Sequence, residues 1–193
     1  MSNSQSEPIM YTAFAGPRQI ASGPRGFILT AVKQHLDSID ERVLIFEDDS
    51  GKQVDFDFSG SIDDVLERER AVSARVRPGR PKLGVVGREV SLLPRHWEWL
   101  EEQPNGISAA IRRLVDEARK REPGAQLARR LRDGISRFMW SMAGDLPNYE
   151  EAARALHTGD QPRLEDLVSA WPADVRAHVL RLAAKAAELA TGS

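Results

Sequence analysis

The sequence contains no cysteine. Disulfide bonds, thiolate zinc sites and cysteine nucleophiles are therefore excluded, and the absence fits a reducing cytoplasm. No run of about 18 apolar residues occurs, so we expect no membrane-spanning helix. The opening MSNSQSEP is polar and lacks the basic and apolar regions of a secretory signal, which predicts a cytoplasmic protein.

Catalytic signatures are also missing. The sequence has no GxxxxGK[ST], no GxSxG and no strand-anchored GxGxxG. His96 and His157 have no second histidine or acidic cluster at ligand spacing. The acidic pairs Asp48-Asp49 and Asp55/Asp57 could bind a metal or act in acid–base chemistry, but a hairpin turn and a solvated sheet face explain them more simply. We expect no enzyme, no catalytic residue, no cofactor and no metal.

Charge is unevenly distributed along the chain, which is 41% hydrophobic and 29% charged, a composition typical of globular proteins. Residues 1–70 have 7 Lys+Arg and 13 Asp+Glu, residues 71–132 have 14 and 7, and residues 133–193 have 6 and 9. A basic middle between acidic ends suggests a polyanionic partner for the middle. Long helices with arginines on their solvated faces would give the same blocks without a partner.

Residues 9–60 predict a small ββαββ domain, after a disordered tail at residues 1–8. Two β-prone runs around Gly16-Pro17-Arg18 predict a hairpin, and apolar residues at helical spacing predict a helix over residues 25–38. Strands are expected at residues 43–47 and 53–58. The second of these strands shows clean alternation, with Val54, Phe56 and Phe58 on one face and Asp55 and Asp57 on the other.

Residues 61–84 predict a charged helix followed by a basic arm rich in Pro and Gly. Ser61 is expected to cap this helix together with Asp64. Residues 123–193 predict a helical bundle, in which Asn148 and Asp160 cap two helices and Gly159 ends one. The predicted fold class is α+β, with residues 85–122 forming a separate central segment between these parts.

The central segment has the layout of arm, strand, helix, tight turn and helix. A strand is predicted at residues 85–93 and is stopped by Pro94. Helices are predicted at residues 95–103 and 108–121, and the turn between them is Pro104-Asn105-Gly106. Trp97 and Leu100 would belong to the core. Ile111, Leu114 and Val115 would also point inward.

With Leu93-Pro94 at the strand–helix junction and Gly106-Ile107-Ser108 at the turn, this segment resembles ribbon-helix-helix DNA-binding proteins. The resemblance covers about a quarter of the chain. It implies an obligate dimer whose paired strands enter the DNA major groove, while the start of the second helix meets a phosphate. Carried across by position, the residues facing DNA would be Arg88, Val90 and Leu92.

The alternation of the predicted strand fits neither possible phase of such a ribbon. The register set by Leu93-Pro94 turns Val90 and Leu92 towards DNA and Glu89 inward. A shift by one residue reverses the faces, because side chains alternate along a strand. An outward Glu89 would then repel phosphates. Base reading by the ribbon is therefore not expected, and pairing is the better role for the strand.

The arm carries four basic residues, Arg75, Arg77, Arg80 and Lys82, interleaved with Pro and Gly. Gly79-Arg80-Pro81 matches the core of an AT-hook, a motif of the minor groove of A·T-rich DNA, although Pro78 stands where a fuller hook has Arg. An extended linker kept soluble by its charge is the alternative. The residues expected to contact DNA are Arg75, Arg77, Arg80, Lys82, Arg88, Arg95, Asn105, Gly106, Ser108 and Arg112.

These patterns lead to two main hypotheses. The first is a dimeric DNA-binding protein, a transcriptional regulator or nucleoid-associated protein, whose partners are double-stranded DNA and a second copy of the chain. The alternative is a protein-interaction adaptor or antitoxin-like partner that dimerises through the same segment without binding DNA. An enzyme of unrecognised type is a third hypothesis, but no residues can be named for it.

Five strings across the chain carry a wider resemblance. They are YTAFAG, GRPKLGVVGREVSLLPRHWEWL, GISAAIRRLVDEAR, RFMWSMAGDLPNYEEAARAL and WPADVRAHVLRLA. They are similar to an uncharacterised bacterial family, domain of unknown function 2239, over nearly the whole chain. This resemblance implies a bacterial cytoplasmic protein and supplies no activity, cofactor or site residue.

Overall fold

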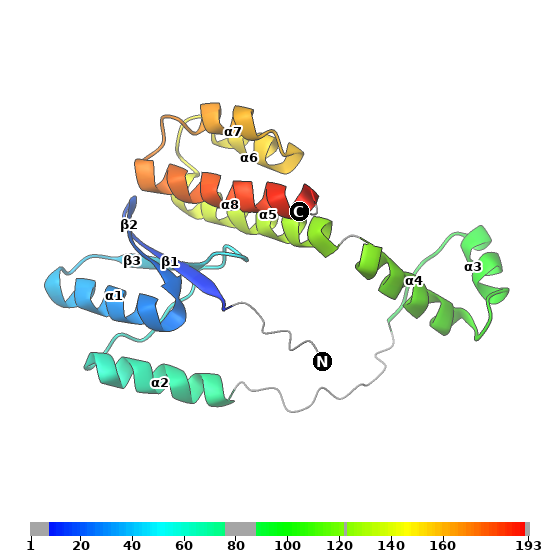
Figure 1. Cartoon of the computed structure of the whole chain (residues 1–193), viewed down its shortest axis with the longest axis horizontal. Coiled ribbons are helices and arrows are strands. Elements are labelled where there is room, and N and C mark those ends of the chain that lie inside the picture. Colours follow the sequence, from blue (N-terminus) through cyan, green and yellow to red (C-terminus); the bar gives the residue numbers. More distant parts are fainter. Residues whose placement is uncertain (1–7, 76–87, 122, 192–193) are drawn as a thin grey trace. The chain divides into compact units, whose positions relative to one another are not determined.

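The structure, a computed structural model, describes residues 8–75, 88–121 and 123–191. It divides into two compact units (Figure 1). The main unit combines Met1–Arg75 with Gly124–Ser193, and the insert unit is Val76–Pro123. The fold is α+β, as predicted, with one three-stranded antiparallel sheet and a majority of helix among the described residues.

Most elements belong to the main unit. Its strands are β1 (Met10–Ala15), β2 (Arg18–Pro24) and β3 (Val43–Glu47). Its helices are α1 (Arg25–Ser38), α2 (Ile62–Arg75), α5 (Pro123–Ala143, whose first residue falls in the insert unit), α6 (Tyr149–Thr158), α7 (Gln161–Leu167) and α8 (Ala173–Thr191). The insert unit contains α3 (Pro94–Glu101) and α4 (Ile107–Arg121).

The sheet has the order β2-β1-β3, so the predicted fourth strand at residues 53–58 is wrong. This segment pairs with β3 only at the bridge between Phe46 and Gln53. Farther on, Arg68 of α2 donates hydrogen bonds to the backbone oxygens of Asp57 (2.6 Å) and Ser59 (3.1 Å), which draws the segment towards α2. The predicted alternation still holds, because Val54, Phe56 and Phe58 pack on the core and Asp55 and Asp57 are exposed.

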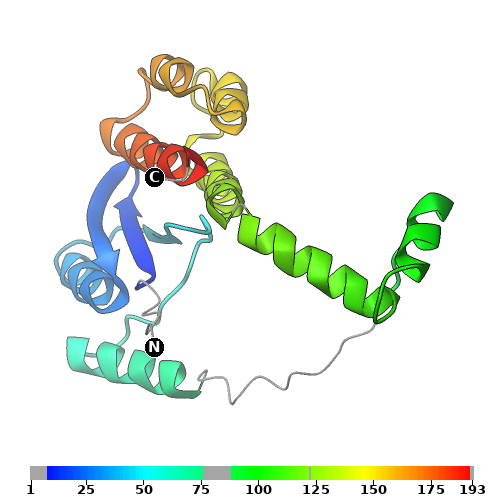
Figure 2. The same ribbon diagram turned by 45° about the vertical axis from the view of Figure 1, so that its right-hand side comes forward.

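The sheet lies between α1 on one side and α5 with α8 on the other (Figures 1 and 2). Alternation along β1 explains this arrangement, since successive side chains point to opposite faces. Tyr11 and Ala13 pack with Ile28 and Val32 of α1. Phe14 instead packs with Phe138 of α5, the ring centroids being 5.3 Å apart.

One hydrophobic core therefore joins segments that the sequence suggested as separate domains, residues 9–60 and 123–193. Phe14 and Phe46 of the sheet are buried in the same cluster as Phe138, Met139 and Val179 of the helices. Burial of large apolar side chains is the main favourable term in folding, so this shared cluster holds the two segments in one body.

Helix ends test the local predictions. Ser61 and Asp64 form the predicted capping box: the Ser61 N–H donates to Asp64 Oδ2 (2.8 Å) and the Asp64 N–H donates to Ser61 Oγ (3.3 Å). Asp160 caps α7 by accepting from the Arg163 N–H (3.2 Å). The predicted Asn148 side-chain cap is wrong, because this residue is left-handed (φ 62°) and its Nδ2 donates to the backbone oxygen of Leu167 (3.4 Å) instead.

The insert unit is a pair of helices joined by a tight turn. Asn105 and Gly106 both have positive φ angles, 68° and 80°, which reverses the chain between α3 and α4. Leu100 and Ala110 are buried between the helices. Of the predicted strand, residues 85–87 lie outside the described residues and residues 88–93 form no strand. A strand needs a second strand for its backbone hydrogen bonds, and the described part of this unit offers none.

The turn after β3, residues 48–51, is packed directly against α5. Gly51 has a φ of 61°, and its backbone packs directly on the backbone of Gly134. A Cβ atom added to Gly134 would lie 2.8 Å from the backbone oxygen of Asp49 and 2.9 Å from the backbone carbon of Ser50. These two glycines allow the turn to approach the helix more closely than any side chain would permit.

Replacement of Gly134 by Ala is expected to lower the free energy of unfolding by about 1–3 kcal/mol, because overpacking against a fixed backbone outweighs the gain of about 1 kcal/mol in helix propensity. Gly26→Ala is the matched control, since Gly26 is also helical and a Cβ there would meet nothing within 4 Å. The control should be neutral or stabilising. Urea unfolding followed by circular dichroism gives both values, and equal effects of the two substitutions would contradict the packing argument.

Candidate nucleic-acid interface and a buried polar cluster

The residues predicted to contact DNA fall into three groups. Arg77, Arg80 and Lys82 lie outside the described residues, and Arg75 is the last residue of α2. Arg88 and Arg95 are exposed in the insert unit. The structure brings the remaining four together around the start of α4; they are Asn105, Gly106, Ser108 and Arg112.

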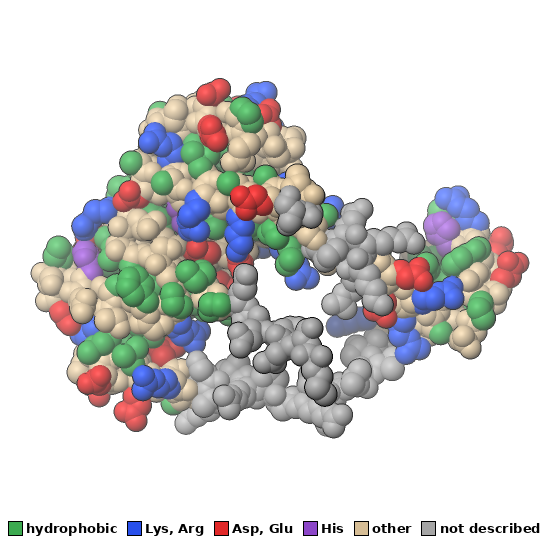
Figure 3. All heavy atoms as spheres, in the orientation of Figure 1, with side chains coloured by type: hydrophobic (Ala, Val, Ile, Leu, Met, Phe, Trp, Pro, Cys, Tyr) green, Lys and Arg blue, Asp and Glu red, His purple; other side chains and the backbone are tan. Residues whose placement is uncertain are grey.

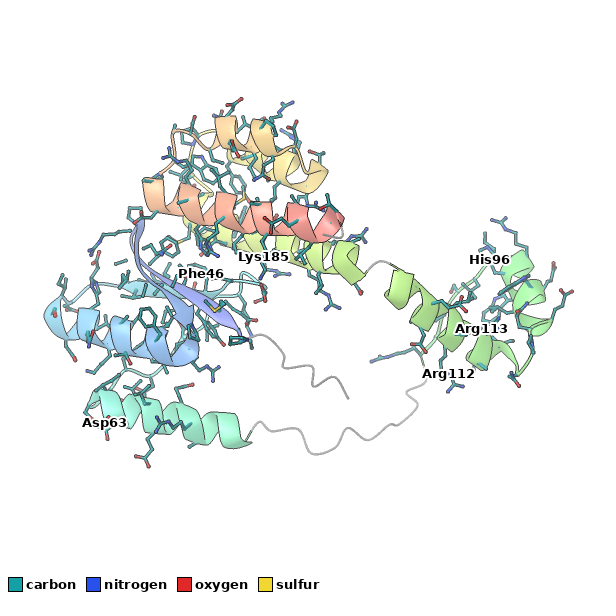
Figure 4. All side chains as sticks on the ribbon, in the orientation of Figure 1. Phe46, Asp63, His96, Arg112, Arg113 and Lys185 are labelled. Atoms are coloured by element: carbon teal, nitrogen blue, oxygen red, sulfur yellow. The ribbon has the colours of Figure 1, made fainter. Side chains whose placement is uncertain are left out.

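At the start of α4 the N–H groups of Ala109 and Ala110 donate to the backbone oxygen of Gly106, both at 3.1 Å, so these two donors are already used within the helix. The first turn contains no acidic residue to offset the positive end of the helix dipole. Arg112 reaches back and donates from Nε to the Ser108 oxygen (3.0 Å), which keeps its guanidinium close to the first turn. Figure 4 shows Arg112 and Arg113 on α4 and His96 on α3.

The insert unit also has an apolar groove of about 380 Å³. We call it the insert groove, and its lining residues are Val90, Leu92, His96, Trp99, Leu100, Ile111, Leu114 and Val115. Large apolar side chains in it are exposed, including Val90 (56%), Val115 (50%) and Trp99 (46%). Exposed apolar surface of this kind marks interaction sites in soluble proteins.

The insert groove shows on which side two residues of the predicted ribbon lie. Val90 and Leu92 face the helices, because both line the groove. Glu89, Ser91 and Leu93 do not line the groove, and these residues are exposed. This set has one acidic, one hydroxyl and one apolar side chain. It lacks the Arg, Lys, Asn or Gln that make the usual bidentate contacts to base edges.

Charge in the described part of the insert unit is mixed. Between residues 88 and 118 the basic residues are Arg88, Arg95, Arg112 and Arg113, and the acidic ones are Glu89, Glu98, Glu101, Glu102, Asp116 and Glu117. The face visible in Figure 3 shows both kinds intermixed with apolar side chains. The basic surplus of the middle of the chain therefore comes from residues 75–82 and from the arginine- and lysine-rich sequence after residue 118.

The main unit contains a buried polar cluster that the sequence did not indicate. Asp48, at the end of β3, is 3% exposed and accepts from Thr12 Oγ1 (2.7 Å) and from Arg181 (3.0 Å). The same guanidinium lies 3.0 Å from Nδ1 of His178, which is 2% exposed. The sequence predicts Asp48 in a turn, and the structure places it in one. Its partners on α8 are 130 or more residues away, a distance that no local pattern spans.

The geometry fixes the protonation of His178. Arginine has only donors, so Nδ1 must accept and the imidazole is neutral. Burial lowers the pKa of His178 from 6.5 to about 4; the Asp48 carboxylate acts against this shift and the Arg181 charge adds to it. The cluster thus combines one buried carboxylate, one cation and one neutral imidazole, and among the described residues no buried side-chain N or O atom lacks a partner.

Other chemically suggestive contacts do not form a site. Ser136 Oγ lies 3.0 Å from His157 Nε2 on the surface of α5 and α6. Among the described side chains, no carboxylate forms a hydrogen bond with the imidazole of His157, so the pair lacks the third member of a catalytic triad. In the described ranges, no group of three or more His, Asp or Glu residues is placed to hold a metal ion. None of the helices in the described part of the chain has the length and apolar character needed to cross a membrane.

Comparisons with known proteins give one match. A bacterial family described as "Uncharacterized protein conserved in bacteria (DUF2239)" matches residues 10–183. Curated proteins and solved structures give no match.

Acidification is expected to destabilise the protein through His178. Below pH 6.5 this histidine is protonated in the unfolded chain, but in the folded chain it stays neutral down to about pH 4. The free energy of unfolding therefore falls as the pH is lowered through this range. Between pH 7 and pH 5 the loss from this residue is about 2 kcal/mol. Urea unfolding at both pH values should show a smaller loss for His178→Gln, whose amide oxygen can still accept from Arg181. An equal loss in the variant would rule out His178 as the source.

Proposed function

The chain belongs to the DUF2239 family of uncharacterized proteins conserved in bacteria, whose description names no activity, and we propose from its residues that it is a dimeric DNA-binding protein. The insert unit would form the dimer, and the basic arm with the start of α4 would contact the DNA backbone. The observation that carries the proposal is the insert groove, an exposed apolar surface on a small two-helix unit. In the sequence, the basic arm comes directly before this unit.

Dimerisation through the insert groove would satisfy two needs at once. A unit as short as Val76–Pro123 has little core of its own, and such units usually require oligomerisation or another support. A second copy laid on the groove would remove Val90, Trp99 and Val115 from water. It would also give residues 88–93 an identical strand to pair with, as in the ribbon-helix-helix arrangement.

The mode of DNA binding follows from the phase of the ribbon. With Val90 and Leu92 in the groove, the outward side chains are Glu89, Ser91 and Leu93, which are poor readers of bases. Affinity would then come from phosphate and minor-groove contacts of the arm and from the start of α4, which carry little sequence information. We therefore favour a nucleoid-associated role over a sequence-specific regulator.

A second candidate uses the same groove for a different partner. Between residues 88 and 118 the insert unit has six acidic and four basic residues, an unusual balance for a DNA-binding surface. An adaptor or antitoxin-like protein would dimerise through the groove and bind another protein without DNA. Dimerisation and DNA binding are therefore tested separately.

Replacement of Val115 by Lys is expected to convert the dimer into a monomer, because it places a charge in the apolar groove. Ile39→Lys is the matched control, since Ile39 of the main unit is also 50% exposed. Sedimentation or light scattering at micromolar concentration gives the mass. If Val115→Lys keeps the dimer, the groove is not the interface. If Val115→Lys yields a monomer and weakens DNA binding, although the substitution adds a positive charge, DNA binding requires the dimer.

Changing Arg77, Arg80 and Lys82 together to Ala is expected to weaken binding to duplex DNA by about tenfold or more at low salt. The slope of log K against the logarithm of the salt concentration should become less negative by about 2 to 3, because three phosphate contacts are lost. The control triple, Arg42, Lys52 and Arg163 to Ala, removes the same charge from exposed positions of the main unit. Fluorescence anisotropy on A·T-rich and mixed duplexes measures both.

Absence of binding by the unchanged protein at low salt would contradict the DNA-binding proposal, and a dimer without DNA affinity would then favour the adaptor. Equal losses in the two triple variants would show that only overall charge matters, not the arm.

A further inference from the structure

The main unit has a second hollow that the proposed function does not use. It has a volume of about 510 Å³ and lies between the turn after β3, α5 and α8. We call it the turn pocket. Its size falls within the range of about 300–1,000 Å³ that small-molecule sites occupy. All the residues that line it belong to the main unit, so it is independent of the insert groove.

The turn pocket combines an apolar floor with cations. Leu127 and Leu131 of α5 and Leu189 of α8 supply the apolar part. Leu127 is 49% exposed although it belongs to a stably packed helix. Arg130, Arg137 and Lys185 supply the cations from the same two helices. Figure 4 marks Lys185 on α8.

Two of the cations are held in place by the turn. The Arg137 guanidinium donates to the backbone oxygen of Ser50, and Lys185 Nζ lies 3.0 Å from Asp49 Oδ1. Arg130 differs from them. Among the described residues, nothing forms a hydrogen bond or ion pair with its side chain, which leaves its five N–H donors available.

The charge balance indicates the valence of a ligand. The lining contains three cations and two carboxylates, those of Asp49 and Asp133, so it has a net charge of +1. One negative charge would neutralise it. Arginine holds a carboxylate through two parallel hydrogen bonds, and the leucines would receive a hydrocarbon part of the same molecule.

We propose that the turn pocket binds a small amphipathic monocarboxylate, with its carboxylate on Arg130 and its hydrocarbon chain or ring on Leu127, Leu131 and Leu189. The ligand would bridge α5, α8 and the turn. Binding would therefore stabilise the contact between the sheet and the helices, because a ligand that binds only the folded state raises its stability.

The test is a calorimetric titration of the full-length protein, without DNA, with octanoate and with benzoate, which supply the two kinds of hydrocarbon part. Octanol and octylamine are the matched neutral and cationic probes. At least one carboxylate is expected to bind saturably, and octanol and octylamine at least fivefold more weakly. Arg130→Gln should weaken carboxylate binding at least fivefold. Arg129→Gln, on the same helix but outside the lining, should change it less than twofold.

Three results would overturn the proposal. The first is that neither carboxylate binds saturably to the unchanged protein. The second is that octanol or octylamine binds as tightly as the tighter-binding carboxylate. The third is that Arg130→Gln and Arg129→Gln have the same effect. Arg130 is exposed, so its replacement should leave the fold intact, and circular dichroism checks this. A loss of thermal stabilisation by octanoate in Arg130→Gln alone would support the proposal independently.

Discussion

The clamp on the turn after β3 is the interaction on which the main unit depends. Four successive residues are held by α5 or α8: Asp48 by Arg181, Asp49 by Lys185, the Ser50 oxygen by Arg137, and Gly51 by the backbone of Gly134. The Asp48 pair counts most, because removal of Arg181 would leave the buried Asp48 carboxylate without its cation. The exposed Lys185 pair counts little, since water and salt screen it. This clamp adds to the shared hydrophobic core that joins the sheet to the helical tail.

Because the main unit is closed by segments from both sides of the insert, the two units can serve different purposes. The main unit has a large shared core and a buried polar cluster, and among the described residues no buried side-chain N or O atom lacks a partner. The insert unit leaves Trp99, Leu114 and Val115 exposed around the insert groove. The proposed dimer would cover this surface. The proposed monocarboxylate site belongs to the other unit, next to the clamp.

Local features of the fold were predictable from the sequence where a few neighbouring residues decide them. The Ser61–Asp64 capping box, the cap at Asp160 and the span of α1 all depend on residues within one or two turns of each other. The same reasoning failed at Asn148, where a left-handed backbone turns the side chain away from the helix. It failed again at residues 53–58, where the alternation was present but Arg68 of a later helix donates to the backbone oxygen of Asp57. In each failure a distant residue or a backbone angle overrode the pattern.

The sequence by itself determined the α+β class, the membership of the bacterial family, the helices of the insert unit and the basic arm. Periodicity and composition within short stretches indicate the helices and the basic arm, and similarity over the whole chain indicates the family. Only the tertiary structure decided that Phe14 and Phe46 share a core with α5 and α8, that Asp48 meets His178 and Arg181, and that Val90 and Leu92 face the insert groove. The physical reason is distance along the chain: such contacts form between residues that no spacing rule connects, and burial and charge pairing select them only when the whole chain packs.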